Sequence, residues 1–284
     1  MQQDESLFLS RIVDAIATVP GITAIVLGGS RASGTHTPTS DYDIGLYYDG
    51  GAPFDLATLR QVVRNLDDQR RGDAVTPLGG WGAWINGGGW LTIEGQAVDL
   101  IYRDEARVAH IVDEVPRGHF ESFYHWGHPH AFISTIYAAE IALCHPLRDP
   151  NGHIAALKGR LQPYPPRLRQ RMATDFLYGA EFLYNVGLHG LPRGDSNYTA
   201  GCCFRAITCL AQSLCALNER WVMNEKGVVA LAAHLPLTID DFDGHVATIY
   251  ARLPQGADGP VAALTMLGDV IAQGRTIVET HLPD

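Results

Sequence analysis

The chain has 284 residues, of which 46% are hydrophobic and 18% charged, and its formal net charge is −10. This length can bury one large or two modest cores, and the composition excludes a chain that is disordered over most of its length. The acidic balance argues against a broad surface for nucleic-acid phosphates, because such surfaces need clustered Lys and Arg.

The first third of the chain mixes helical and strand-like patterns. Two amphipathic helices and four short strands are predicted: helices over 5–18 and 55–69, and strands over 23–27, 41–47, 90–94 and 96–102. Between them, the glycine-rich passage 79–89 indicates a mobile loop or a hairpin turn. This part of the chain therefore predicts a small mixed-sheet domain.

After Arg103 the strand-like runs stop and helical patterns dominate. Helices are expected over 104–115, 131–145, 166–189, 198–220, 225–234, 240–253 and 259–280. The predicted fold class is α+β. A catalytic domain over residues 1–115 should be followed by an all-α helical bundle over 116–284.

The sequence gives no sign of export or of membrane insertion. The first residues lack a basic stretch followed by an apolar one, and we find no apolar run near the roughly 20 residues that a membrane span needs. The five cysteines show no metal-ligand spacing and are interpreted as reduced thiols. We therefore expect a cytoplasmic protein without a membrane partner.

The first predicted strand ends in Gly28-Gly29-Ser30. Two glycines let backbone amides approach an anion closely, and Ser30 adds a hydroxyl where a short helix should begin. The alternative is an ordinary strand-to-helix turn. A nucleophile elbow would need glycine where Ala32 stands, and no Walker-type loop is present. The segment therefore predicts a phosphate-binding loop of another kind.

Three aspartates follow this loop in an order that suits a metal site. Asp41 and Asp43 are two residues apart, so on a strand they project from one face, and Asp99 interrupts an otherwise apolar strand. Oxygen ligands of this kind suit Mg²⁺, and converging carboxylates are tolerated where a cation is expected. The alternatives are a solvated strand edge for the first pair and local backbone bonding for Asp99.

In combination, these motifs resemble the signature of the DNA polymerase beta nucleotidyltransferase superfamily, over roughly residues 20–104. The resemblance implies that Gly28, Gly29, Ser30 and Arg31 bind the phosphates of a nucleoside triphosphate. It implies that Asp41 and Asp43 bind Mg²⁺, and that Asp99 binds the metal nearer the attacking hydroxyl or acts as its base. The family commonly has glycine two residues after the arginine, whereas here glycine comes third, at Gly34.

The helical part is similar to that of the aminoglycoside adenylyltransferases that modify streptomycin and spectinomycin. The similarity lies in residues 216–227 and implies that Lys226 reaches the triphosphate. Its further implication is transfer of AMP, with ATP as the expected donor, to a hydroxyl of a small acceptor such as an antibiotic, and not to nucleic acid. The alternatives are transfer to RNA or protein, and a non-catalytic, antitoxin-like nucleotide-binding module.

Two further features have open interpretations. Glu140, in a predicted helix, is an alternative general base to Asp99, or an exposed helix residue. The histidine-rich loop around 119–130 either lines the cleft between the domains, forms plain surface, or holds a transition metal, which its spacing does not favour; its histidines are His119, His125, His128 and His130.

Overall fold

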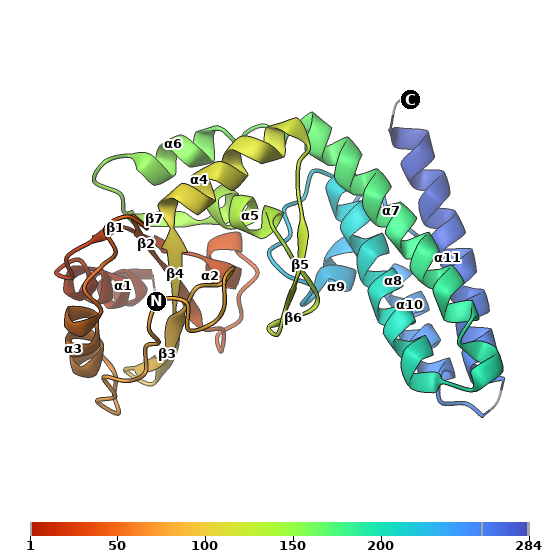
Figure 1. Ribbon diagram of the computed structural model, residues 1–284, viewed down its shortest axis with the longest axis horizontal. Coiled ribbons are helices and arrows are strands. Elements are labelled where there is room, and N and C mark those ends of the chain that lie inside the picture. Colours follow the sequence, from red (N-terminus) through yellow and green to blue (C-terminus); the bar gives the residue numbers. More distant parts are fainter. Residues whose placement is uncertain (1, 257, 283–284) are drawn as a thin grey trace. The chain divides into compact units, whose positions relative to one another are not determined.

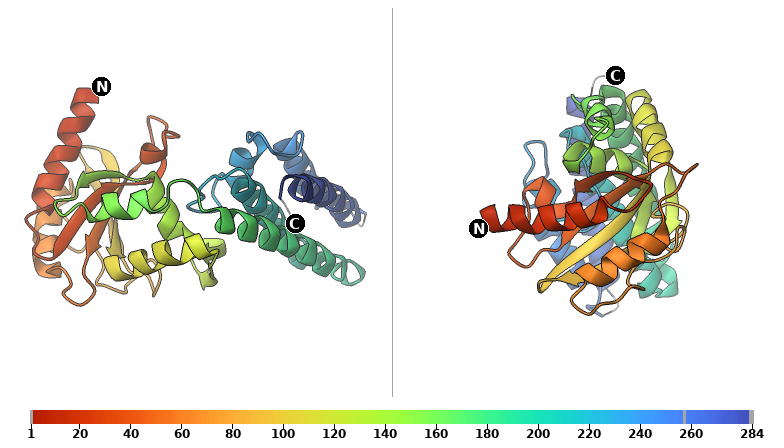
Figure 2. Two further views of the ribbon diagram at one scale, coloured as in Figure 1. Left: turned by 90° about the horizontal axis from the view of Figure 1, so that it is seen from above. Right: turned by 90° about the vertical axis from the view of Figure 1, so that its left-hand side faces the viewer.

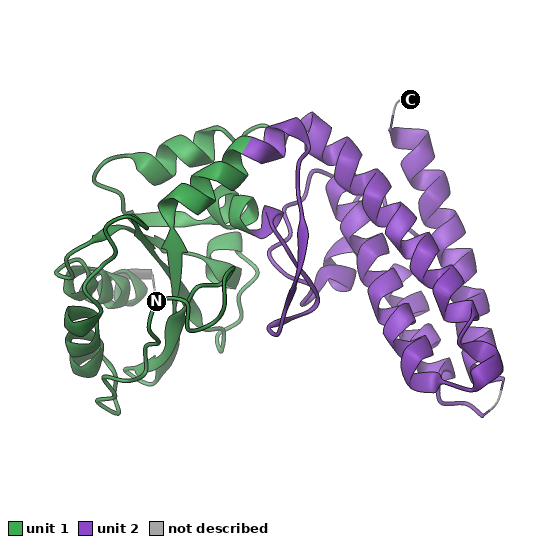
Figure 3. Cartoon of the chain, viewed as in Figure 1, with its two compact units in different colours: residues 1–113, 137–163 green, residues 114–136, 164–284 purple. Residues whose placement is uncertain are grey.

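The computed structural model describes residues 2–256 and 258–282, which form two compact units (Figure 3). The first unit comprises the chain up to Asp113 together with residues 137–163, and the second comprises residues 114–136 and the chain from Tyr164 on. The chain therefore passes between the two units three times, after residues 113, 136 and 163, whereas the sequence predicted a single boundary after residue 115. The reason is that a strand beyond residue 140 returns to the first unit and completes its sheet.

The first unit is built on a five-stranded mixed sheet with the order β3-β4-β2-β1-β7 (Figure 1). Its strands are β1 (Ile22–Leu27), β2 (Tyr42–Tyr48), β3 (Gly88–Ile93), β4 (Gln96–Asp104) and β7 (His145–Arg148). Strands β2 and β4 are parallel, and the other neighbours are antiparallel. All four predicted strands of this region are present, and β3 and β4 meet at the expected turn, where Glu94 and Gly95 have positive φ.

Alternation along the strands gives the sheet two different faces. One face is apolar and packs on α1 (Gln2–Ile16) and α3 (Leu56–Leu66), which lie on the same side of the sheet in Figures 1 and 2. Its side chains include Ile44 of β2 and Leu100 of β4, both fully buried. The intervening residues, Asp43 and Asp99 among them, belong to the opposite face, which we call the site face.

The remaining elements of the first unit are short helices: α2 (Gly29–Ser33), α4 (Glu105–Glu114), most of α5 (Thr135–Leu143) and α6 (His153–Gly159). The predicted helix over 131–145 is shorter than expected, because its first residues belong to a strand that ends at Ile133. Neither β7 nor α6 was predicted. Strand β7 has four residues and contains Pro146, so it shows no alternation.

The second unit is helical, as predicted, but it also contains a hairpin of β5 (Ser122–His125) and β6 (His128–Ile133). Helices α7, α8 and α11 lie alongside one another in Figure 1. The helical elements are η1 (Val115–Arg117), α7 (Pro166–Leu188), η2 (Leu191–Arg193), α8 (Ser196–Leu217), α9 (Val228–Ala233), α10 (Phe242–Arg252) and α11 (Gly259–His281). The expectation that strands end at Arg103 is therefore wrong, and the α+β fold class is confirmed.

Two helices of the second unit, α8 and α11, are long and apolar enough to cross a membrane by length and composition alone. The expectation that no run reaches this length is therefore wrong. Helix α8 is 78% buried within its apolar window, as is usual for the core helix of a soluble domain, whereas α11 is 39% buried there. Length and composition are weak evidence for a span, because core helices pass the same test.

The β5–β6 hairpin is fixed to the loop before α9 by one carboxylate. Glu225 accepts hydrogen bonds from the backbone N–H of His130, at 2.8 Å, and pairs with Nδ1 of His128, at 3.1 Å. The His130 ring is 7% exposed, with Nε2 at 3.9 Å from Sγ of Cys209. Burial, together with the positive charge of Arg205, lowers the pKa of His130 to about 4 against the opposing charge of Glu225.

This lowered pKa predicts acid sensitivity of the second unit. Unfolded His130 takes up a proton below about pH 6.5, but the folded ring does so only near pH 4, so its contribution to stability falls through that window. We expect a loss of up to about 3 kcal/mol at the acid end. Urea unfolding at pH 7 and pH 4.5 should show a smaller acid loss in His130→Gln. The control His234→Gln replaces an exposed histidine and should keep the wild-type loss of stability. Equal pH dependence of unfolding in all three proteins would contradict the role of His130 in acid sensitivity.

Candidate active site

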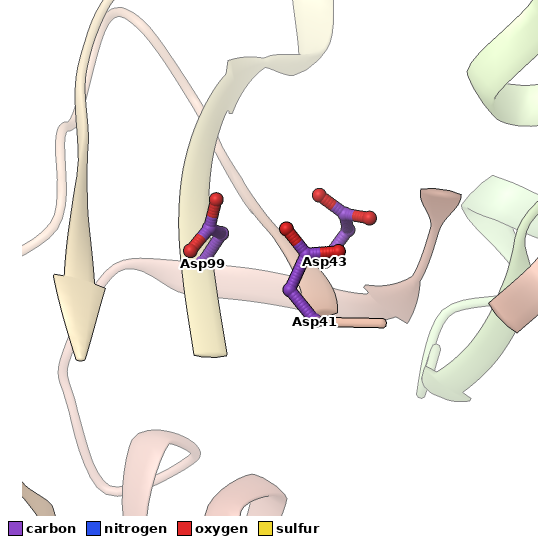
Figure 4. Close-up of side chains that lie close together, drawn as sticks. All are labelled: Asp41, Asp43 and Asp99. Atoms are coloured by element: carbon purple, nitrogen blue, oxygen red, sulfur yellow. The ribbon is translucent and has the colours of Figure 1, made fainter. Parts of the chain in front are cut away.

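Three carboxylates converge on the site face of the sheet. One oxygen of each of Asp41, Asp43 and Asp99 lies within 4.8 Å of the others, and Figure 4 shows the three groups gathered at the start of β2 and beside it on β4. Among the described residues no other group of three or more acidic, histidine or cysteine side chains meets this test. The sequence-based prediction that the three aspartates come together is thus correct in its geometry.

The parallel pairing of β2 with β4 sets this convergence. Asp43 and Asp99 are direct neighbours across the two strands, so their side chains leave the same face about 4.8 Å apart at the backbone. Asp41 stands just before β2, two residues from Asp43 along the chain. The strand register thus brings two of the carboxylates together, and the loop that enters β2 brings the third.

Gly29 controls the position of the Asp43 carboxylate. Its φ is +61°, and a Cβ at this position would lie 1.6 Å from Oδ2 of Asp43. A side chain at residue 29 would therefore displace the carboxylate. Gly28 has a different role from the predicted one, because its N–H donates to the carbonyl of Asp43 at 2.8 Å and extends the pairing of β1 with β2.

Ser30 lies in the first turn of α2, immediately beside Gly29. The first amides of a helix lack partners within the helix, so those of Gly29, Ser30 and Arg31 suit an anion. Within the described part of the chain the Ser30 hydroxyl makes no hydrogen bond, so it is available to a ligand. This geometry fits the predicted phosphate-binding loop, although the amide of Gly28 is already used.

Arg31 holds the loop that enters β2. Its Nε donates to the carbonyl of Asp41 at 3.0 Å, and its Nη2 donates to the carbonyl of Ser40 at 2.7 Å. Nη1 donates to Glu5 of α1 at 3.1 Å, and the guanidinium lies over the Tyr42 ring, 3.7 Å from its centroid. These bonds use three of the five guanidinium N–H groups and the side chain is 8% exposed, so its geometry favours positioning of Asp41. The sequence carried no signal for Glu5.

Glu140 is paired and lies away from the triad. Arg103 donates to both of its carboxylate oxygens at 2.6 Å. Burial alone would lower the pKa of Arg103, but the charge and hydrogen bonds of Glu140 outweigh it and raise that pKa. Arg103 is four residues beyond Asp99 on β4, or about 13 Å along the strand. The geometry therefore favours Asp99 over Glu140 as the general base.

The other predicted site residues belong to the second unit. Lys226 is exposed, and its backbone N–H donates to Oδ1 of Asn224 at 2.8 Å. Of the four histidines, His119 pairs with Glu114 at 2.6 Å, and His125 accepts from the N–H of Gly127. His128 and His130 share Glu225, and the rings of His125 and His128 lie 5.8 Å apart. The four histidines do not form one of the metal-suited groups found among the described residues.

The arrangement of the triad fits a divalent cation. Three oxygen ligands face one point, and each like-charged pair at 4.8 Å would repel by about 3.5 kcal/mol at an effective dielectric of 20, less solvent and salt screening. A Mg²⁺ ion removes this repulsion and accepts oxygen ligands with several waters or phosphate oxygens. Asp41, Asp43 and Asp99 are the residues that would hold it.

Comparison with known proteins agrees with this geometry. Residues 9–121 match the family model described as a nucleotidyltransferase domain, and that region contains the Gly28–Ser30 loop and all three aspartates. Residues 9–121 thus carry a nucleotidyltransferase domain. The crystal structure of a nucleotidyltransferase-like protein from Exiguobacterium sibiricum is similar with a TM-score of 0.41 and 13% identity, over 96% of this chain and 78% of that one. A search of curated sequences gives no match.

The Gly29 geometry predicts a specific loss of metal binding. Gly29→Ala should displace the Asp43 carboxylate and weaken Mn²⁺ binding by about tenfold or more, as is usual when a group that orients a metal ligand is changed. Electron paramagnetic resonance measures this affinity. Gly34→Ala is the matched control, since its φ is +73° but its Cβ would have no neighbour within 4 Å. Both variants should lose about 1–2 kcal/mol of stability, because alanine is strained in the left-handed backbone conformation of both glycines. Equal metal affinity in the two variants would refute the positioning role.

Proposed function

We propose that this nucleotidyltransferase moves AMP from ATP to a hydroxyl group of a small-molecule acceptor with the help of Mg²⁺. The observation that carries the proposal is the convergence of the Asp41, Asp43 and Asp99 oxygens within 4.8 Å. When bound, Mg²⁺ neutralises charge on the phosphates and aligns attacking and leaving oxygens. The family match supports nucleotidyl transfer in general, and the donor, the metal and the acceptor class are our proposal.

In the proposed reaction each part of the first unit has one task. The acceptor oxygen attacks the α-phosphorus, the bond from that phosphorus to the bridging oxygen breaks, and pyrophosphate leaves with the electron pair. Asp99 takes the hydroxyl proton, since Glu140 is paired with Arg103. Asp41 and Asp43, with Asp99 as the third oxygen ligand, would hold the cation, and Ser30 with the first amides of α2 would bind the β- and γ-phosphates.

Charge supports a small acceptor over a nucleic acid. The net charge is −10, and a nucleic-acid partner would need clustered cations to replace its counterions. A complex with tRNA or duplex DNA in an electrophoretic shift assay at physiological salt would favour the alternative, transfer to RNA.

The five cysteines are free and buried, which supports a reducing, cytoplasmic setting for the enzyme. Likeness to the streptomycin and spectinomycin adenylyltransferases makes antibiotics the first acceptors to test.

Replacing one triad member tests the proposal directly. Asp43→Asn should lower kcat/KM for AMP transfer by at least about a hundredfold, measured as pyrophosphate release, because one ligand of the cation is lost. The metal-free variant should be no less stable than the wild type, since one mutual repulsion disappears. Asp14→Asn removes the same charge from the exposed side of α1 and should leave both quantities unchanged. Near-normal turnover of Asp43→Asn at saturating Mg²⁺ would defeat the assignment.

A second test concerns Lys226, which the likeness to the adenylyltransferases makes a ligand of the triphosphate. A lysine is a compact point charge suited to a phosphate oxygen, and this one is exposed. Lys226→Ala should lower kcat/KM for ATP by roughly ten- to a hundredfold, which corresponds to about 1.5–3 kcal/mol for one charge-assisted contact, with an unchanged melting temperature. Unchanged kinetics would make Lys226 a surface residue.

A further inference from the structure

Two tryptophans stack on each other beside the carboxylate triad. Trp90 stands on β3 directly opposite Asp99 of β4, and its side chain is 61% exposed. The rings of Trp81 and Trp90 are stacked, with centroids 4.5 Å apart and planes 30° from parallel. Two stacked indoles form a continuous apolar surface, and such a surface next to polar groups is typical of a binding site.

The pair lies on the site face. Cross-strand partners share a face, so Trp90 projects on the same side of the sheet as Asp99 and, one strand further, Asp43. Gly88 precedes Trp90 by two residues and faces the same way. A Cβ there would lie 1.9 Å from the carbonyl oxygen of Leu100 and 2.7 Å from the Trp81 ring, so the missing side chain leaves room for the backbone of β4 and for that ring.

The order of residues across the sheet places the tryptophans opposite the phosphate loop. Starting from the end of β1, the order is the Gly29-Ser30 turn, Asp43 on β2, Asp99 on β4 and Trp90 on β3. In an in-line displacement the leaving pyrophosphate and the attacking hydroxyl lie on opposite sides of the α-phosphorus. With the phosphates at the Ser30 end, the hydroxyl has to approach from the β4–β3 side.

We propose that Trp81 and Trp90 form the acceptor subsite and bind a saturated, hydroxylated ring of the sugar type through its C–H face. This inference rests on the proposed function. Neighbouring strands are about 4.8 Å apart, so a ring stacked on Trp90 reaches Asp99 with a hydroxyl on its edge. An indole offers a broad apolar face to the C–H side of such a ring and leaves the hydroxyls at its rim free. Trp81 holds the Trp90 ring in place from its other side.

The binding test needs no catalysis. The indole N–H signals of Trp81 and Trp90 are assigned in ¹⁵N-labelled protein through Trp81→Phe and Trp90→Phe, and then followed during titration with three ring probes: streptomycin, spectinomycin and methyl β-D-glucopyranoside. We expect at least one probe to shift both signals saturably. Trp90→Ala should weaken its Kd by about tenfold, and Trp90→Phe, which keeps an aromatic face, should retain most of the affinity.

Three results would overturn the proposal. The first is that no ring probe shifts either indole signal, and the second is that Trp90→Ala binds the probe as tightly as the wild type. The third is that only p-cresol or adenosine shifts the signals, which would assign the pair to an aromatic acceptor or to the nucleobase. Melting temperatures establish that Trp90→Ala is folded. The control Leu7→Ala removes an equally exposed apolar side chain (65%) from α1 and should bind like the wild type.

Kinetics separate this inference from the proposed function. With an acceptor that is modified, Trp90→Ala should raise KM for the acceptor about tenfold and leave KM for ATP unchanged, whereas a raised KM for ATP would contradict the assignment. Ring binding at the tryptophans without any AMP transfer would sink the proposed function and leave the subsite standing. Transfer that proceeds with unaltered acceptor KM in Trp90→Ala would sink the subsite alone.

Discussion

The mutual repulsion of three carboxylates is the constraint on which the first unit depends. Asp43 and Asp99 are neighbours because β2 and β4 are parallel and in register, and Asp41 is close because Arg31 holds the carbonyls of Ser40 and Asp41. The buried apolar face on the other side of the sheet, with α1 and α3, provides the stability that offsets this repulsion. The structure thus keeps a cation site assembled by means of contacts that do not involve the cation.

The same constraint accounts for how the surroundings are built. At Gly29 the Asp43 carboxylate occupies the space of a side chain, and at Gly88 the Leu100 carbonyl and the Trp81 ring occupy it. Charges further along the site face are neutralised inside the protein, as the buried Arg103 shows with Glu140. The triad differs from that pair, because its carboxylates gather next to one another around a point suited to a cation. On the same face of the sheet, Arg103 with Glu140 is therefore a structural ion pair, whereas the three aspartates form a candidate cation site.

Much of this arrangement could be predicted from the sequence, because the relevant signals are local. The first four strands alternate clearly, and the spacing of Asp41 and Asp43 defines a shared face. The strands after Arg103 were missed, because β5 has only four residues, β6 contains Pro129 and β7 contains Pro146, and β6 and β7 do not alternate in hydrophobicity. The bonds of Arg31 to Glu5 and Ser40, and the stacking of Trp81 on Trp90, depend on tertiary contacts between separate elements, and residue spacing does not encode them.

The parallel pairing of β2 with β4 has a consequence for folding. Parallel neighbours cannot be joined by a tight turn, so the chain between them makes a long crossover that contains α3, the glycine-rich passage and β3. Closing such a loop costs entropy before any contact offsets it, and pairings of this kind form slowly. A nascent chain that has reached only Asp43 contains β1 but not yet β4 with Asp99, so affinity for a divalent cation arises late. Cation binding therefore reports the completed tertiary structure of the first unit and not its local elements.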